Sequence, residues 1–179
     1  KSSMDDRIEL AAQIANSIDK PVIVWCHMNE ESERLAKLIN GAVEVTGSPP
    51  LDVKSNNVMS FTHGESRALV SKASICGFGM NWQHCDTMIF AGMDDSFEKY
   101  YQAVRRCHRF GQKKQVTVHI ITAETEGAVK ANIERKQAQA NEMAAKMIDR
   151  MRQITKAQIV GARSNTETYN PTLPMTIPA

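Results

Sequence analysis

The segment from Ser96 to Gln112 gathers the side chains best suited to chemistry in this sequence. One glutamine and three arginines lie close together in it: Gln102, Arg105, Arg106 and Arg109. At about 3.6 residues per turn, these side chains fall on one sector of a helix. An adjacent stripe is expected to pack on a sheet, and it consists of Phe97, Tyr101, Val104 and His108. We therefore predict a helix over residues 96–109, ended by Gly111, that presents a glutamine and three guanidinium groups.

Neighbouring guanidinium groups favour a bound anion. Their mutual repulsion is costly unless a negative charge lies opposite, and they donate paired hydrogen bonds to phosphate oxygens. A triphosphate supplies such an anion. In phosphoryl transfer, an arginine that stabilises the charge on the γ-phosphate can raise the rate by roughly 10³ to 10⁵. The simpler interpretation is a solvated basic face, or arginines paired with acids elsewhere in the fold.

A second segment, Leu69 to Gln83, joins the end of a strand to a glycine-rich loop and a helix start. Gly77 and Gly79 form a G-x-G pattern in it. Glycine lets a backbone approach a ligand closely, and the amino end of a helix attracts anions. Alone, this pattern more often marks an ordinary turn. We interpret Trp82 as packing beneath the loop, with a base-stacking platform as the alternative.

The arginine segment resembles motif VI of superfamily 2 helicases, a glutamine followed by two arginines three residues apart. Gln102, Arg106 and Arg109 match this pattern. The ending from His108 to Gln112 is similar to the Swi/Snf-related form rather than to the DEAD-box form. The resemblance implies that Arg106 and Arg109 are arginine fingers and that Gln102 contacts ATP. At the position of Arg105, many relatives carry a different residue.

The glycine-loop segment resembles motif V of the same superfamily. That resemblance implies that Ser71 and Lys72 contact nucleic-acid phosphates, while Gly79 and Asn81 lie near the nucleotide. The strand ending at His27 resembles motif IV, and His27 is a candidate nucleic-acid contact, with a structural histidine as the alternative. The resemblance covers roughly residues 20–125.

The motifs that hold phosphate and magnesium in this superfamily are missing from the sequence. It contains no G-x-x-x-x-G-K-S/T loop and no strand ending in D-E-x-x. The resemblance assigns both to a first RecA-like lobe of the same polypeptide, which would hold most of the ATP and Mg. We therefore predict the second motor lobe of an ATP-dependent helicase or translocase, inactive alone. Its expected partner is nucleic acid, and the Swi/Snf-like ending favours double-stranded DNA.

Two other functions fit the same residues. A free-standing lobe could bind nucleic acid or a partner without catalysis, and a different P-loop fold could use its arginines to grip another phosphate ligand. An upstream reading frame with a phosphate loop would indicate the motor. A native start codon just before Lys1 would indicate the free-standing module.

Strand and helix patterns alternate along the chain and predict an α/β fold. The apolar run Val22–Cys26 is typical of a strand buried on both faces, and further strands are predicted at 42–45, 68–71, 87–90 and 116–121. Helices are predicted at 5–18, from a cap at Asn29 to Gly41, at 52–61, at 96–109 and from 126 to about 158. Such alternation gives a parallel sheet with helices on both faces, in three layers, and ligands meet the carboxyl ends of the strands.

The predicted organisation is a lobe over residues 1–125, a long helical extension over 126–160 and an irregular tail over 161–179. The extension carries a stripe of Met143, Met147, Met151 and Ile154 beside an excess of basic residues. We interpret it as a solvated face with a stripe that packs on the lobe. A brace between two lobes and a basic arm on nucleic acid are the alternatives.

The composition is typical of a globular domain. The apolar fraction is 42%, the net charge is +2, and no apolar run is long enough to span a bilayer. No C-x-x-C pair occurs among the four cysteines, and the doublets His84-Cys85 and Cys107-His108 match no zinc template, so we expect reduced thiols and no metal site. Without a secretory signal, the expected location is intracellular. It is cytoplasmic if the compact lobe is of phage or bacterial type.

Overall fold

The computed structural model describes residues 2–76, 79–93, 96–122 and 127–164, with side chains from residue 3 to residue 156 except 127–130. The chain divides into two compact units, Lys1–Lys136 and Gln137–Ala179, and each is described by itself. The predicted boundary between lobe and extension, at residue 125, lies outside the described residues. Residues 165–179 of the predicted tail also lie outside the described residues.

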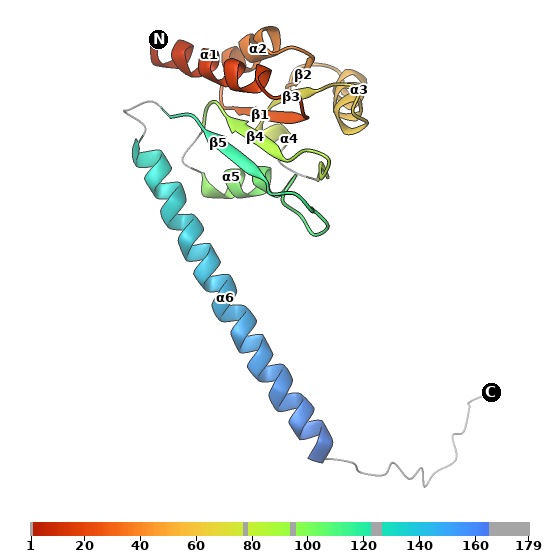
Figure 1. Cartoon of the computed structure of the whole chain (residues 1–179), viewed down its shortest axis with the longest axis vertical. Coiled ribbons are helices and arrows are strands. Elements are labelled where there is room, and N and C mark those ends of the chain that lie inside the picture. Colours follow the sequence, from red (N-terminus) through yellow and green to blue (C-terminus); the bar gives the residue numbers. More distant parts are fainter. Residues whose placement is uncertain (1, 77–78, 94–95, 123–126, 165–179) are drawn as a thin grey trace, which may run out of the picture. The chain divides into compact units, whose positions relative to one another are not determined.

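Five parallel strands form the centre of the first unit (Figure 1). In chain order they are β1 (Val22–Cys26), β2 (Ala42–Val45), β3 (Ala68–Lys72), β4 (Thr87–Phe90) and β5 (Thr117–Ile120). Their spatial order is β2-β3-β1-β4-β5, and each neighbouring pair is parallel. The predicted parallel sheet is confirmed, and each strand begins and ends within a residue of its expected bounds.

The described part of the chain also contains helices of very different length. They are α1 (Ser2–Asn16), α2 (Asn29–Leu38), α3 (Leu51–Thr62), α4 (Ala73–Cys76), α5 (Phe97–Val104) and α6 (Gly127–Ser164). The helix expected over 52–61 is confirmed as α3. The short α4 lies where the glycine pattern predicts only a loop. α6 is a single helix that runs past its predicted end near residue 158.

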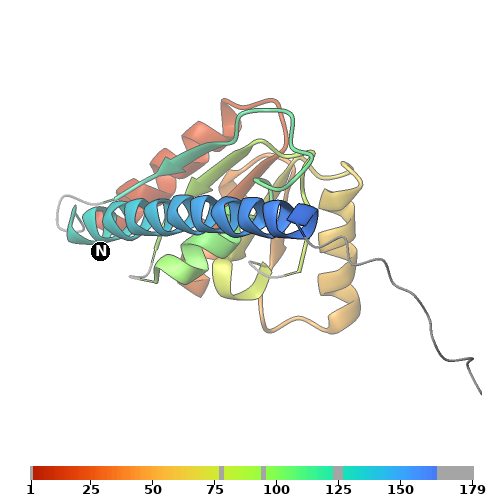
Figure 2. The same ribbon diagram turned by 90° about the horizontal axis from the view of Figure 1, so that it is seen from below.

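Alternate residues of β1 belong to two hydrophobic cores on opposite faces of the sheet. Val22 and Val24 pack in the core that contains α1 and α2, whereas Ile23 and Trp25 pack in the core that contains α3, α4 and α5. A strand points successive side chains to opposite faces, so a strand covered on both sides must be apolar throughout. Helices lie on both faces of the sheet (Figures 1 and 2), which confirms the three-layer prediction.

A buried carboxylate fixes the loop between β1 and α2. Glu31 is only 1% exposed, and its Oε2 accepts hydrogen bonds from the backbone N–H groups of His27 (2.9 Å) and Met28 (3.0 Å). Its Oε1 pairs with Nη2 of Arg7 at 3.1 Å, which connects α1 to the same loop. Because this carboxylate holds the backbone just ahead of α2, the N-cap residue is Met28. The expected cap at Asn29 is wrong by one residue.

The end of α2 also differs from the expectation. The helix stops at Leu38 and not at Gly41, whose φ of 67° lies in the left-handed region. Gly41 instead turns the chain into β2, a conformation that glycine adopts without steric cost.

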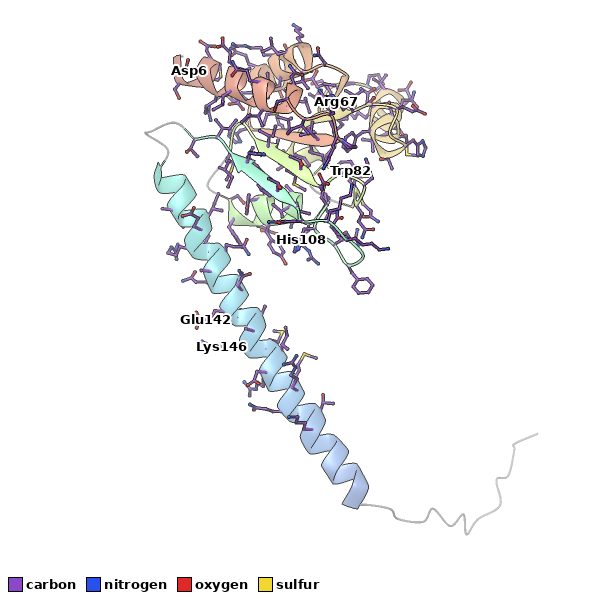
Figure 3. The ribbon with its side chains drawn as sticks, in the orientation of Figure 1. Asp6, Arg67, Trp82, His108, Glu142 and Lys146 are labelled. Atoms are coloured by element: carbon purple, nitrogen blue, oxygen red, sulfur yellow. The ribbon has the colours of Figure 1, made fainter. Side chains whose placement is uncertain are left out.

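Arg67, just before β3, closes the carboxyl end of α1 (Figure 3). Its guanidinium group donates to the carbonyl oxygens of Ala15 (2.8 Å), Ile18 (2.6 Å) and Asn40 (2.7 Å). The last carbonyl groups of a helix lack partners within the helix, and a cation favours that end of the helix dipole. One side chain therefore joins α1, the loop before β2 and the start of β3.

The described part of the second unit is helical throughout. Along it, Met143 is 67% exposed, Met147 56% and Met151 61%. Glu142 and Lys146 form an ion pair at 2.6 Å on the same helix (Figure 3). None of the described helices combines the length and the apolar character needed to cross a membrane.

The close approach of Gly92 to Glu31 gives a stability test. A Cβ atom at Gly92 would lie 2.5 Å from Oε2 and 2.8 Å from Oε1 of the buried carboxylate. We expect Gly92→Ala to lower the free energy of unfolding by about 1–3 kcal/mol, because the added methyl group displaces a carboxylate that holds two backbone N–H groups. Urea unfolding followed by circular dichroism measures the change.

Gly47→Ala is the matched control for this substitution. A Cβ atom at Gly47 meets nothing within 4 Å, so this variant is expected to be as stable as the wild type or slightly more stable. Equal stability of the two variants would contradict the proposed clash.

Candidate nucleotide and nucleic-acid interface

The arginine-bearing segment is helical only in its first half. α5 follows the N-cap Ser96, whose hydroxyl accepts from the backbone N–H of Lys99, and it ends at Val104. Beyond it, Arg106 N bonds to the carbonyl of Ala103, the spacing of a tightened helix end. The predicted helix over residues 96–109 is therefore too long. Arg109 lies in the turns that follow α5 and does not share a helix face with Gln102.

The buried face of α5 also differs from the prediction. Residues Tyr100, Ala103, Val104 and Cys107 meet the core on this side of the sheet. Tyr101 and His108, both assigned to the predicted stripe, are exposed. The two stripes have the same helical spacing and differ by about one residue, so periodicity alone does not separate them. Small side chains at 103 and 107 let the segment lie close to the sheet, and this selects the observed stripe.

Arg106 is held by main-chain carbonyl groups. Its Nε donates to the carbonyl of Gln102 at 3.0 Å, and its Nη1 donates to the carbonyl of Met80 at 3.1 Å. Burial, followed by the positive charges of Arg109 and Arg105, lowers the pKa of the Arg106 guanidinium. Across the described residues, no carboxylate pairs with Arg106 or with the exposed Arg109. The guanidinium of Arg106 is thus oriented by carbonyl groups, with no carboxylate of the described segments beside it.

The glycine loop lies against this arginine. The carbonyl of Met80 accepts from Arg106, and the backbone N–H of Trp82 donates to the carbonyl of Arg106 at 2.9 Å. Gly79 and Asn81 flank Met80, are exposed, and Gly79 has a φ of 77° that favours glycine. The structure therefore brings the predicted Gly79 and Asn81 of the glycine loop close to Arg106.

Gln102, the remaining motif VI residue, has one amide atom free. Its Nε2 donates to Glu98 Oε1 at 3.1 Å. Its Oε1 is buried and has no hydrogen-bond partner in the described part of the chain. This acceptor lies one helical turn before Arg106, so a ligand that meets the arginine could also donate to it.

Two glutamines, to which the sequence assigns no role, connect the segment after the glycine loop with the turns that follow α5. Gln112 Nε2 donates to the carbonyls of Gln83 (2.9 Å), Cys85 (3.4 Å) and Cys107 (3.3 Å). Gln83 Nε2 in turn donates to the carbonyl of Phe110 at 2.5 Å. Gln112 closes the segment from His108 to Gln112 that resembles the Swi/Snf-related form. The sequence signal for its role is its position directly after Gly111, a residue type that is common in turns.

The predicted nucleic-acid residues occupy the carboxyl ends of β1 and β3. His27 is exposed and Lys72 is half-buried, and both line a cavity of about 230 Å³ at this edge. Ser71 differs, because its side chain is fully buried and its hydroxyl donates to the carbonyl of Val45 at 2.7 Å. In this position Ser71 holds β2 against β3 and does not face the edge.

Trp82 packs beneath the glycine loop, as expected from the sequence. It is 0% exposed, its ring stands edge-on to Phe61 at 5.6 Å, and its Nε1 donates to Thr62 Oγ1 at 2.9 Å (Figure 3). A wholly buried ring offers no stacking surface, so the alternative of a base-stacking platform does not apply in this conformation.

The cysteines are buried free thiols, at positions Cys26, Cys76, Cys85 and Cys107. Burial raises the pKa of Cys26 to about 12 and also raises the pKa of Cys76, so these thiols stay protonated at neutral pH. Across the described ranges, no group of three or more His, Cys, Asp or Glu side chains is placed to hold a metal ion.

The fold and the motifs together define the second RecA-like lobe of a superfamily 2 helicase-type ATPase. The chain belongs to the helicase conserved C-terminal domain family, which it matches over residues 6–111. It is similar to the TATA-binding protein-associated factor mot1 of Aspergillus fumigatus, with 32% identity over 110 residues. That match covers 54% of this chain and 6% of the relative, so the chain spans only a small part of it.

Solved structures share the same fold. The C-terminal part of the Fun30 ATPase domain superposes with a TM-score of 0.61 at 17% identity, over 71% of this chain and 45% of that chain. The C-terminal domain of the DEAD-box protein Dbp5 gives 0.61 at 11% identity, over 74% and 78%. A variant of S. cerevisiae Dbp5 bound to RNA and ADP BeF3 gives 0.64 at 13% identity, over 74% and 36%. At these identities the likeness shows the fold alone.

The free energy of unfolding tests whether the Gln112 hydrogen bonds hold the two loops together. We expect Gln112→Ala to lower the free energy of unfolding by about 1–3 kcal/mol, because loop carbonyl groups lose their donor. Gln115→Ala is the control, since Gln115 is exposed in the same loop. Thermal and urea unfolding compare the two variants, and an equal, small effect of both substitutions would show that Gln112 does not hold the loops together.

Proposed function

We propose that this chain is the second motor lobe of an ATP-dependent helicase or translocase, with Arg106 and Arg109 as arginine fingers. The observation that carries the proposal is that two carbonyl groups orient Arg106, while no carboxylate in the described part of the chain pairs with Arg106 or Arg109. A permanently charged, oriented group without a counter-ion is suited to bind an external phosphate.

The residues around Arg106 fit one part of a bound nucleotide, its terminal phosphate. The two carbonyl contacts of Arg106 use Nε and Nη1 and leave Nη2 for an anion. The unpartnered Oε1 of Gln102 would accept a hydrogen bond from a hydroxyl or amine of the ligand. ATP and Mg, held mainly by a first lobe, supply the phosphoryl chemistry when bound. Arg106 and Arg109 would stabilise the negative charge that develops on the phosphate.

The nucleic-acid surface in this proposal lies at the carboxyl ends of β1 and β3, with His27 and Lys72 as its contacts. Contacts to backbone phosphates depend on salt and carry little sequence information. The RNA-bound Dbp5 variant shares this fold, which supports a nucleic-acid partner. The resemblance of the segment from His108 to Gln112 to the Swi/Snf-related form of motif VI favours double-stranded DNA as the substrate.

A series of contacts would couple the two surfaces. Arg106 bonds to Met80 in the glycine loop, and α4 lies between that loop and Lys72. α4 packs against both β3 and α5. If Arg106 shifts when it meets a phosphate, its hydrogen bond to Met80 would pass that shift to the glycine loop, and the packing of α4 on β3 would pass it to the strand-end surface. Nucleotide binding would thus bias a hinge equilibrium between two lobes.

Phosphate release tests the arginine fingers. In a protein that joins this chain to a first lobe with a phosphate loop and a D-E-x-x strand, Arg106→Ala and Arg109→Ala are expected to lower nucleic-acid-stimulated kcat by roughly 10³-fold or more. The isolated chain is expected to show no turnover above a buffer blank, because it lacks the phosphate cradle. Turnover by the pure chain that Arg106→Ala abolishes would refute this assignment.

Arg105→Ala is the matched control for the arginine fingers. Arg105 is exposed in the same turn and also lacks a carboxylate partner in the described residues. A general loss of basic charge would lower kcat equally in all three variants. The proposal requires that Arg105→Ala retain most of the activity.

The salt dependence of binding tests the nucleic-acid surface. We expect Lys72→Ala to weaken binding of labelled duplex DNA and to reduce the slope of log K against log salt by about 1, because one phosphate contact is lost. Lys20→Ala is the control, since Lys20 lies ahead of β1 at the opposite, amino-terminal edge of the sheet. Fluorescence anisotropy with duplex DNA, single-stranded DNA and RNA measures both variants. An unchanged slope for Lys72→Ala would remove this residue from the surface.

A further inference from the structure

Lys99 is a basic residue to which no motif resemblance assigns a role, and the structure places it beside two residues that have one. It lies in the first turn of α5 and lines the cavity of about 230 Å³ at the carboxyl edge of the sheet. His27, directly after β1, and Lys72, the last residue of β3, line the same cavity. Three elements that are far apart in the sequence therefore bring three basic side chains to one recess.

The groups that this recess offers to a ligand are polar. Trp25 and Phe90 also line it, but they are 0% and 2% exposed, so their rings provide no surface for stacking. Lys72 and Lys99 are half-buried, and His27 is exposed. None of the described lining residues is acidic. Because a lysine ammonium group carries three donors and a full charge, the recess is suited to an anion with several oxygen acceptors, such as a backbone phosphate.

The helix that carries Lys99 also leads to the proposed arginine finger. Gln102 follows Lys99 by three residues, so these two positions lie one turn apart on the same side of α5. The carbonyl of Gln102 accepts a hydrogen bond from Nε of Arg106 at 3.0 Å. A displacement of this short helix at its first turn would therefore move a carbonyl group that orients Arg106.

We propose that Lys99 binds a backbone phosphate of the nucleic acid, next to those bound by Lys72 and His27, and that α5 transmits this contact to Arg106. The inference rests on the proposed function, because it requires nucleic acid at the carboxyl edge and a nucleotide phosphate at Arg106. The route through α5 is separate from the one through the glycine loop and α4. Nucleic acid at one end of α5 favours the Arg106 orientation that meets ATP, and by linkage ATP tightens the binding of nucleic acid.

Two substitutions at position 99 separate the charge of the side chain from its length. Lys99→Gln removes the charge and keeps a long side chain, whereas Lys99→Arg keeps both. Neither changes the backbone N–H of residue 99, which donates to Ser96 Oγ at the start of α5, so the cap of the helix is retained. Lys37→Gln is the matched control, since Lys37 is exposed in the last turn of α2 and does not line the cavity.

The salt dependence of binding tests the phosphate contact in the two-lobe protein without nucleotide. Lys99→Gln is expected to weaken binding of labelled duplex DNA and to reduce the slope of log K against log salt by about 1, because one phosphate contact is lost. Lys99→Arg and Lys37→Gln are expected to keep the wild-type slope. Fluorescence anisotropy measures the affinities, and circular dichroism compares the folds of the variants.

The coupling between DNA and nucleotide tests the transmission through α5. The ratio of the DNA dissociation constants without and with a non-hydrolysable ATP analogue measures this coupling. Lys99→Gln is expected to reduce the ratio by roughly fivefold, and Lys37→Gln to leave it unchanged. A residue that only adds charge to the surface would weaken DNA binding equally with and without the analogue, and the ratio would stay that of the wild type.

The outcomes distinguish this inference from the proposed function. An unchanged salt slope for Lys99→Gln, beside a reduced slope for Lys72→Ala, would overturn the role of Lys99 and leave the nucleic-acid surface standing. Unchanged slopes for both variants would overturn the surface as well. An unchanged coupling ratio for Lys99→Gln would overturn the transmission through α5. Weaker binding of the analogue to Lys99→Gln in the absence of DNA would also overturn the inference, because the phosphate at Lys99 would then belong to the nucleotide.

Discussion

Arg106 is oriented by the carbonyl groups of Gln102 and Met80, and the rest of the site depends on this choice of partners. A carboxylate would both orient and neutralise a guanidinium group, whereas carbonyl groups only orient it. Burial and the adjacent charges of Arg109 and Arg105 lower the Arg106 pKa, and within the described ranges no carboxylate pairs with this guanidinium group. In the proposed function, an incoming phosphate supplies the negative charge that the described residues do not place beside Arg106.

The parallel direction of the strands explains why the other residues of interest meet at one edge. Each strand of a parallel sheet delivers the residue after it to the same side, so His27 and Lys72 come together although they are far apart in sequence. The loop after β1 stays in place because the buried Glu31 binds its backbone N–H groups, and the loop after β4 can pass beside that carboxylate only because residue 92 is glycine. The fold thus fixes this edge by contacts inside the protein.

Much of the architecture follows from patterns that are local in the sequence. The apolar run of β1 requires cover on both faces, and the alternation of strands with helices requires a parallel sheet. The prediction was wrong where two local solutions have similar energy. α5 could bury either of two adjacent stripes, and contact with the sheet selected the one with small residues at 103 and 107. The cap of α2 moved to Met28 because a buried acid three residues later holds the preceding backbone.

The sequence by itself determined the family and the order of the strands and helices along the chain, because these depend on residue type and spacing within short segments. Only the tertiary structure decided that Ser71 turns inward to Val45, that Gln112 connects two loops, and that His27 and Lys72 line one cavity. Those outcomes depend on which carbonyl or ring lies opposite a side chain after folding. Contacts between distant segments are not encoded in local periodicity.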